Sequence, residues 1–129
     1  MDTRTKIVSM EYAAAAARSG RAAGKPVTLV GGFFDPLLAA HARRLAEIAP
    51  RGGALFVALQ DPPLPVLPAQ ARAELVAALC MVDYVILPGP LAPGLADWIP
   101  AEAVFSEEAA DQRRTQDFIQ RVHDRQKQS

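Results

Sequence analysis

One short segment of the chain places residue types that could hold an anionic ligand directly after a predicted strand. Gly31 and Gly32 follow the apolar, β-branched run at residues 26–30, and His41 comes in the helix that follows. Ligands of open α/β sheets bind at the carboxyl ends of strands, and a helix N-terminus favours anions through its free amides and its dipole. The stretch at residues 31–41 is therefore the candidate ligand site, and phosphate is the chemistry it favours.

Asp35 and Pro36 lie in the same segment and also have a structural interpretation. Asp is a preferred N-cap and Pro a preferred first helical residue, so the pair predicts the start of a helix. His41 then shares an apolar helix face with Leu38 and Leu45. Two interpretations stay open for each polar residue. His41 is either a partly buried histidine of that face or a phosphate contact, and Asp35 is either an N-cap or a site residue.

Apolar runs of strand length alternate with helical patterns along the chain, which is the order of βαβ units. Such units predict a parallel sheet with helices on both faces. We therefore expect an α/β, Rossmann-like fold in a single domain of residues 1–129, with a lead-in helix at about 1–24 and a frayed tail at about 120–129. Strands are predicted at 26–30, 54–59, 84–87 and, more weakly, 102–105. Helices are predicted after Ser9, after Pro36, at 69–81 and from Glu107, and a single helical turn is predicted at 95–99. In the helical region at 69–81 and just after it, Leu75, Leu79 and Val82 are expected to point inward.

Composition and charge exclude several classes of function. The chain carries 14 Lys and Arg against 14 Asp and Glu, and a neutral chain lacks the positive surface of a nucleic-acid binder. No apolar stretch approaches the ~18 residues of a membrane span, and the polar N-terminus is followed by no signal-peptide core. Cys80 is the only cysteine, and its apolar surroundings predict a buried, reduced thiol in a cytoplasmic protein. With two histidines and no second cysteine, no metal site is expected.

Residues 32–41, G-F-F-D-P-L-L-A-A-H, resemble the G-x-F-D-x-x-H-x-G-H signature of the cytidylyltransferase-like nucleotidyltransferase family. Further segments are similar to one branch of it, the adenylyltransferase domain of bifunctional heptose-phosphate kinase/adenylyltransferases and the glycerol-3-phosphate cytidylyltransferases. These segments are residues 6–11, Leu67-Pro68, residues 72–74 and residues 79–85. The resemblance rests on their order and spacing, and it implies the nucleotidyltransferase variant of the Rossmann-like fold.

The resemblance also implies an activity. A phosphate oxygen of a sugar or polyol phosphate would attack the α-phosphate of ATP or CTP, with Mg²⁺ present and pyrophosphate leaving. Catalysis of this kind consists mainly of positioning and of stabilising charge on the phosphates. The family motif implies that His41 is the catalytic residue. Arg72 is expected either to face the phosphates or to have a surface or salt-bridge role. The residues expected to bind nucleotide are Gly31, Gly32, Phe33, Phe34, Asp35, His41 and Arg72.

The signature is incomplete at the positions that would meet the phosphates. Leu38 stands at the family's first histidine and Ala40 at its glycine, and the loop at 60–68 has no Lys or Arg where the family has a basic loop. Arg113-Arg114-Thr115 is only a partial echo of the family's C-terminal R-T-x-G-x-S-T signature. Two functions therefore stay open. One is a nucleotide-binding protein that retains some transfer; the other is a catalytically inactive member acting in protein interaction or oligomerisation, a homodimer among the expected assemblies.

Overall fold

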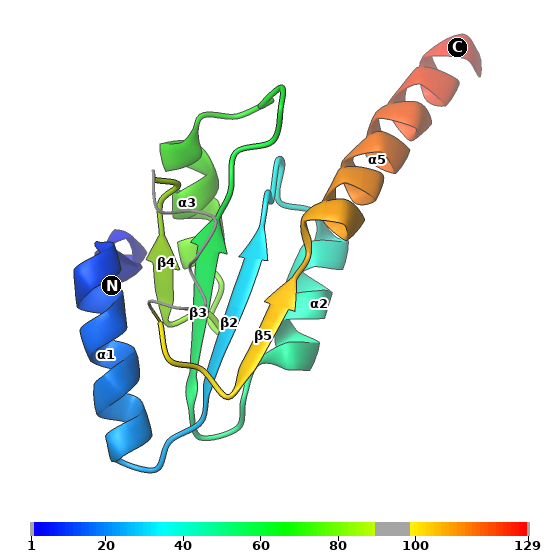
Figure 1. The fold of residues 1–129 in the computed structure, drawn as a ribbon. Helices are drawn as coiled ribbons and strands as arrows, with labels where there is room; N and C mark the ends of the chain where they lie inside the picture. The colour runs from blue at the N-terminus through cyan, green and yellow to red at the C-terminus, as the bar shows by residue number, and fades with distance from the viewer. Residues whose placement is uncertain (1, 90–98, 129) are drawn as a thin grey trace.

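Five parallel strands form one sheet in the order β1-β4-β3-β2-β5 (Figure 1). The structure, a computed structural model, describes residues 2–89 and 99–128. The strands are β1 Ile7–Val8, β2 Val27–Gly32, β3 Ala54–Leu59, β4 Tyr84–Ile86 and β5 Ala103–Ser106. The helices are the 3₁₀ helix η1 Thr3–Lys6, α1 Met10–Ala22, α2 Ala39–Ile48, α3 Ala69–Ala77 and α5 Glu108–Gln128. The predicted α/β, Rossmann-like fold with a parallel sheet is confirmed.

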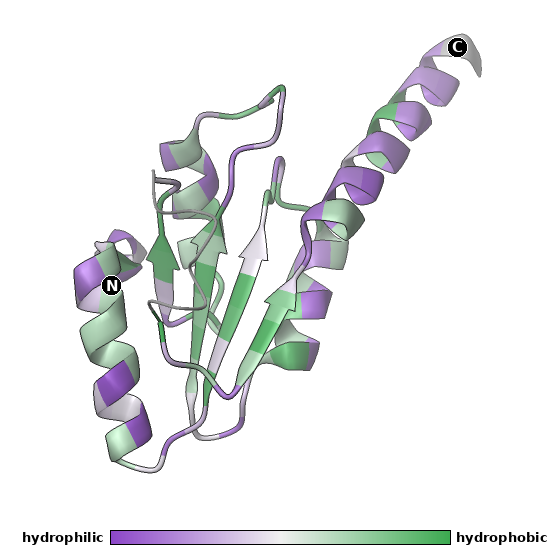
Figure 2. Cartoon of the chain, viewed as in Figure 1, coloured by the Kyte–Doolittle hydropathy of each residue, from purple (hydrophilic) through white to green (hydrophobic). Residues whose placement is uncertain are grey.

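Helices cover both faces of the sheet, and each face has its own apolar core. On the side of α2 and α3, buried side chains such as Val30, Leu45 and Val76 pack together. On the other side, α1 packs Ala13 and Ala17 into a second cluster with residues of β2, β3 and β4. In Figure 2 the central strands are mainly hydrophobic and α5 is mainly hydrophilic. The sheet is thus buried on both faces, as parallel sheets generally are.

The N-terminal segment contains a strand that the sequence did not predict. Ser9 caps α1 as expected, since its Oγ accepts a hydrogen bond from the Tyr12 amide at 3.1 Å. Before it, however, β1 pairs with β4, Ile7 opposite Val85 and Val8 opposite Ile86. Two residues are too few to show a period of two, so only the pairing with β4 identifies this strand.

Two predictions for the α3 region are wrong. The helix ends at Ala77, and its buried positions are Arg72, Ala73, Val76 and Ala77, whereas Leu75 is 44% exposed. Cys80 is exposed as well, in the turn after the helix. Both errors come from treating residues 69–81 as one helix with Leu75 inward, whereas Val82 is buried as predicted and the partly buried Leu79 packs against the core. In the structure small alanines and a buried arginine form the inner face, so Leu75 lies on the opposite side.

The C-terminal helix α5 begins beside β2 and extends well past the edge of the sheet (Figure 1). It remains helical to Gln128, where the sequence suggested fraying. The predicted turn at 95–99 falls on residues 95–98, outside the described part, while Ile99 is fully buried in the core on the α1 side. Within the described ranges, none of the helices combines the length and the apolar character that crossing a membrane requires.

The start of β2 is held by Glu102, and this contact generates a prediction about pH. The Glu102 carboxylate accepts hydrogen bonds from the Val27 amide at 2.6 Å and from Arg21 Nε at 3.2 Å. The Val27 amide, assisted by Arg21, holds the pKa of the Glu102 carboxyl below its usual value of 4.5. A lowered folded-state pKa adds stability above the usual pKa, and this contribution is lost as pH falls through the folded-state value.

We therefore expect Glu102→Gln to melt below the wild-type protein near neutral pH, because the variant keeps an acceptor but loses the charge. The difference between the two melting temperatures should shrink as the pH falls below 4.5, the usual pKa of the carboxyl. Thermal unfolding followed by circular dichroism across this range measures it. A difference that does not change with pH would show that the charge of Glu102 contributes nothing.

Candidate functional site

The carboxyl end of β2 leads into a turn whose two amides point at α5. Gly32 is required there, because a Cβ at this position would lie 2.4 Å from Asp111 Oδ2 and 2.7 Å from the Phe34 ring. Phe34 has φ of 47°, a conformation that only a few per cent of non-glycine residues adopt. Its ring is buried, which holds the residue in this conformation. The turn thereby presents the amides of Phe33 and Phe34 together.

The carboxylate of Asp111 in α5 accepts hydrogen bonds from these two amides. Its side chain is fully buried, and Oδ2 accepts hydrogen bonds from the Phe33 amide at 3.0 Å and the Phe34 amide at 3.4 Å. Oδ1 accepts a hydrogen bond from Arg114 Nη1 at 2.7 Å. A buried carboxylate is stable only when it is paired and hydrogen-bonded, and Asp111 meets both conditions through the turn and its own helix.

His41 lies on the other side of the same carboxylate. The imidazole is fully buried, and its Nδ1 accepts a hydrogen bond from the Leu38 amide at 2.9 Å. Its Nε2 lies 3.1 Å from Asp111 Oδ1, but the two atoms are not aligned as in a regular hydrogen bond. Because Nδ1 is an acceptor, the ring proton of the neutral tautomer is on Nε2, facing Asp111. The Phe34 ring packs against the imidazole at 5.4 Å between centroids. The structure thus has His41 fully buried, and its role as a phosphate contact stays a prediction.

The N-cap role predicted for Asp35 is wrong. α2 begins at Ala39 with Leu38 as its N-cap, and the Asp35–Pro36 peptide bond is cis. The Asp35 carboxylate instead accepts the amides of Val66 at 2.6 Å and Leu67 at 2.7 Å. Asp35 therefore fastens the proline-rich loop at residues 60–68 to the turn after β2, and this tertiary contact takes precedence over the local capping preference.

Arg72 reaches the strand ends, as the sequence allowed, but it faces carbonyl oxygens. Its Nη1 donates to Phe33 O at 3.0 Å and to Gln60 O at 2.9 Å. Its Nε donates to Leu67 O at 3.1 Å, and its Nη2 binds Asp61 Oδ1 at 2.6 Å. The side chain is 1% exposed. The guanidinium thus joins the same loop and turn that Asp35 joins.

The structure brings the predicted site residues into one network at the carboxyl ends of β2 and β3. It also adds Asp111 of α5, which the sequence did not indicate, and Arg114 and Thr115, which the sequence indicated only as a partial echo of the family's C-terminal signature. Asp111 is the most important, and Thr115 Oγ1 donates a hydrogen bond to Asp35 O at 2.9 Å. Asp111 is one of several acidic residues in the first turns of a charged helix, and nothing in its sequence context distinguishes it. Only the pairing of β5 with β2 places it at the turn.

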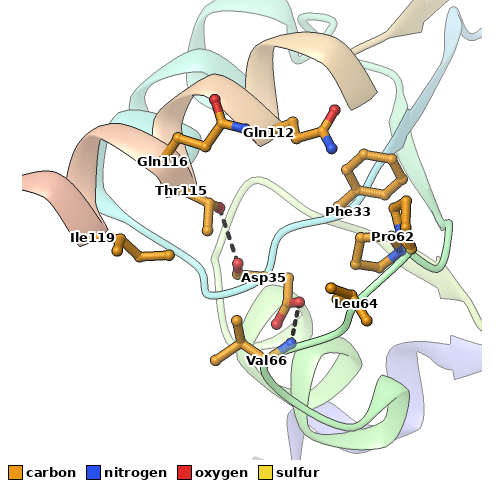
Figure 3. A pocket seen from close by; sticks show the side chains of 10 residues that line it. Phe33, Asp35, Pro62, Leu64, Val66, Gln112, Thr115, Gln116 and Ile119 are labelled. Atoms are coloured by element: carbon orange, nitrogen blue, oxygen red, sulfur yellow. Dashed lines mark hydrogen bonds between the residues drawn. The ribbon is translucent and has the colours of Figure 1, made fainter.

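Two cavities flank this network. The first, of about 190 Å³, lies between the loop and α5 (Figure 3). Its walls are mostly apolar, and Figure 3 shows Asp35 at its base with the bonds to Thr115 and Val66 drawn. It is lined by Phe33, Asp35, Pro62, Pro63, Leu64, Val66, Gln112, Thr115, Gln116 and Ile119.

The second cavity, of about 400 Å³, lies between the start of α2 and the middle of α5. It is rich in arginine, with Asp117 as its single acidic side chain, and Leu38, Ala39 and Ala40 at the start of α2 belong to its wall. The lining residues are Leu38, Ala39, Ala40, Arg43, Arg114, Asp117, Phe118 and Arg121. Cationic side chains and a helix N-terminus together favour an anionic ligand.

The described residues offer no set of protein ligands for the Mg²⁺ that the sequence resemblance implies. Among residues 2–89 and 99–128 no group of three or more His, Cys, Asp or Glu side chains could hold a metal ion. The carboxylates of Asp35, Asp61 and Asp111 already accept hydrogen bonds from backbone amides or arginine. Mg²⁺ that accompanies a nucleotide is held mainly by phosphate oxygens and water, so its binding here would depend on the nucleotide rather than on these carboxylates.

Comparison with known proteins gives one weak relationship. The chain is 37% identical over 81 residues to the bifunctional protein HldE of Halorhodospira halophila (strain DSM 244 / SL1), a match covering 56% of this chain. The match spans only 17% of the length of that protein. No protein-family model matches the chain. The similarity agrees with the relationship predicted from the motif at residues 32–41, at the level of a weak homology.

The geometry of His41 predicts that it stabilises the fold in the absence of any ligand. His41→Ala removes a fully buried side chain and leaves the Leu38 amide without its acceptor, so we expect a loss of about 2–4 kcal/mol in the free energy of unfolding. His123→Ala, an exposed position of α5, is the matched control and should change it by less than about 0.5 kcal/mol. Urea unfolding measures both. Equal stability of the two variants would contradict the buried-histidine geometry.

Proposed function

We propose that this chain is a nucleotidyltransferase-like domain that binds a phosphorylated ligand without transferring a nucleotide. One observation carries the proposal: the Asp111 carboxylate lies on the amides of Phe33 and Phe34 and beside His41. A phosphate oxygen placed on these amides would meet a negative charge in the same space. The weak similarity to HldE supports the nucleotidyltransferase-like part.

The transfer step needs donors whose contacts strengthen as charge develops on the phosphates. In this chain His41 is buried against Asp111, and Arg72 donates to carbonyl oxygens and to Asp61. Leu38 offers no donor at the position of the family's first histidine. Loss of one preorganised donor typically costs about 10²–10³ in rate, so the loss of several leaves little acceleration.

Binding, by contrast, has a suitable surface in the arginine-lined cavity beside α2. Arg43 and Arg121 are exposed, and neither has an ion-pair partner among the described residues. Arg114 adds a third guanidinium that is already paired with Asp111, and Asp117 offsets one of the two remaining charges. A guanidinium group can donate two parallel hydrogen bonds to two oxygens of one phosphate. The phosphates of a nucleotide or of a small phosphorylated compound therefore suit this cavity.

A second candidate function, protein contact or self-association, is favoured by a different surface. Leu64 is 89% and Val66 is 60% exposed on the proline-rich loop, beside Ile119 of α5 at 43%. Light scattering over a wide range of protein concentration tests self-association directly. A constant monomer mass would remove the homodimer from consideration.

The proposal predicts no pyrophosphate release above background. Purified protein with Mg²⁺, ATP or CTP, and a panel of sugar and polyol phosphates should show no turnover in a coupled pyrophosphate assay. The double variant Leu38→His, Ala40→Gly should remain inactive too, because Asp111 still covers the turn. Turnover of the wild-type protein at about 1–10³ s⁻¹, the usual enzyme range, would contradict the proposal.

It also predicts which arginines bind the ligand. Arg121→Gln should weaken the binding of inorganic pyrophosphate about tenfold, because a charge-assisted contact contributes about 1.4 kcal/mol. Arg113→Gln is the matched control, since Arg113 is exposed on the same helix but does not line the cavity. Isothermal titration calorimetry measures both constants. Equal weakening by the two variants, or no binding by the wild-type protein, would refute the cavity as the site.

A further inference from the structure

We propose that the turn after β2, His41 and Arg114 form an oxyanion-binding site that the chain closes with its own Asp111 carboxylate. The site is distinct from the arginine-lined cavity, although Arg114 contacts both. It would accept a small carboxylate or another oxyanion of similar size once Asp111 is removed. The proposal therefore stands or falls independently of the function proposed above.

The donors around Asp111 converge as they do around a bound anion. The amides of Phe33 and Phe34 approach Oδ2 from one side, at 3.0 and 3.4 Å. Arg114 Nη1 donates to Oδ1 at 2.7 Å, and His41 Nε2 lies 3.1 Å from Oδ1, outside the alignment of a regular hydrogen bond. These donors come from three separate elements, namely the turn after β2, α2 and α5. Together they surround a carboxylate that is 0% exposed.

The fixed position of the donors is the reason to expect binding rather than collapse. The two amides belong to a turn that other contacts hold, since the Gln60 amide donates to Gly32 O at 2.9 Å and Arg72 Nη1 donates to Phe33 O at 3.0 Å. His41 is held by its bond to the Leu38 amide. Removal of the carboxylate would leave buried donors without partners, which is unfavourable. An anion of the right size would satisfy them again.

Closure by Asp111 also links the site to the position of α5. The start of the helix is held to the rest of the domain by Asp111, by the bond from Thr115 to Asp35 O, and through the preceding Glu107, which pairs with Arg44 and donates its amide to Gly31 O. An outside anion can take the site only if Asp111 leaves it, and that movement removes one of these attachments. Asp111 is therefore an internal competitor for the site, and α5 is the element that its displacement releases.

The test uses the full chain and formate, which has the size of the group that Asp111→Ala deletes. Melting temperatures of wild type, Asp111→Ala and Glu107→Ala are compared in sodium formate and in sodium chloride at equal ionic strength. Glu107→Ala is the matched control, because it removes a carboxylate that is also buried and ion-paired but is bound by the side chain of Arg44 rather than by the turn.

We expect formate to raise the melting temperature of Asp111→Ala by about 5 °C relative to chloride, as for a ligand at about ten times its dissociation constant. Wild type and Glu107→Ala should melt alike in the two salts. If Asp111→Ala is unfolded in chloride, the expected result is a helical far-ultraviolet spectrum restored by formate. Equal behaviour of Asp111→Ala in both salts, folded or unfolded, overturns the proposal, and so does an equal formate response of Glu107→Ala.

Discussion

The burial of Asp111 is the constraint on which the arrangement around β2 depends. A carboxylate taken out of water is tolerated only when every oxygen finds a donor. The turn after β2 supplies two amides, and this requires a glycine at position 32 and a left-handed conformation at Phe34. His41 meets the same carboxylate while its other nitrogen accepts the Leu38 amide at the start of α2. The Asp111 side chain thus connects α5 to β2 and to α2.

The residues of the family signature that persist here all have partners within the fold. Gly32 makes room for Asp111, Asp35 accepts the amides of the proline-rich loop, and His41 lies between α2 and α5. The two positions that depart from the signature, Leu38 and Ala40, line the arginine-rich cavity instead. A motif retained for packing can preserve a fold without preserving its chemistry. Under the proposed function, this is how the resemblance to nucleotidyltransferases would coexist with the absence of nucleotide transfer.

Local patterns predicted most of the fold but little of the site. β2 and β3 were identifiable as apolar, β-branched runs, and Ser9 as the cap of α1, because these signals lie within a few residues. The contacts that define the site join residues far apart in the chain, Asp111 to Phe33 across 78 positions and Asp35 to Leu67 across 32. No local propensity encodes such pairs, so the roles of Asp35 and Asp111 emerge only from the assembled sheet.

The amides of Phe33 and Phe34 give the most direct test of the account. In the ¹⁵N-labelled wild-type protein, nuclear magnetic resonance can follow their hydrogen exchange and their chemical shifts during titration with inorganic pyrophosphate. If Asp111 holds them, both amides exchange slowly and keep their shifts, while the amides of Ala39 and Ala40 in the arginine-lined cavity move. Rapid exchange of Phe33 and Phe34 in the free protein, with shifts that move as pyrophosphate is added, would show that the turn is open to phosphate and would contradict the account.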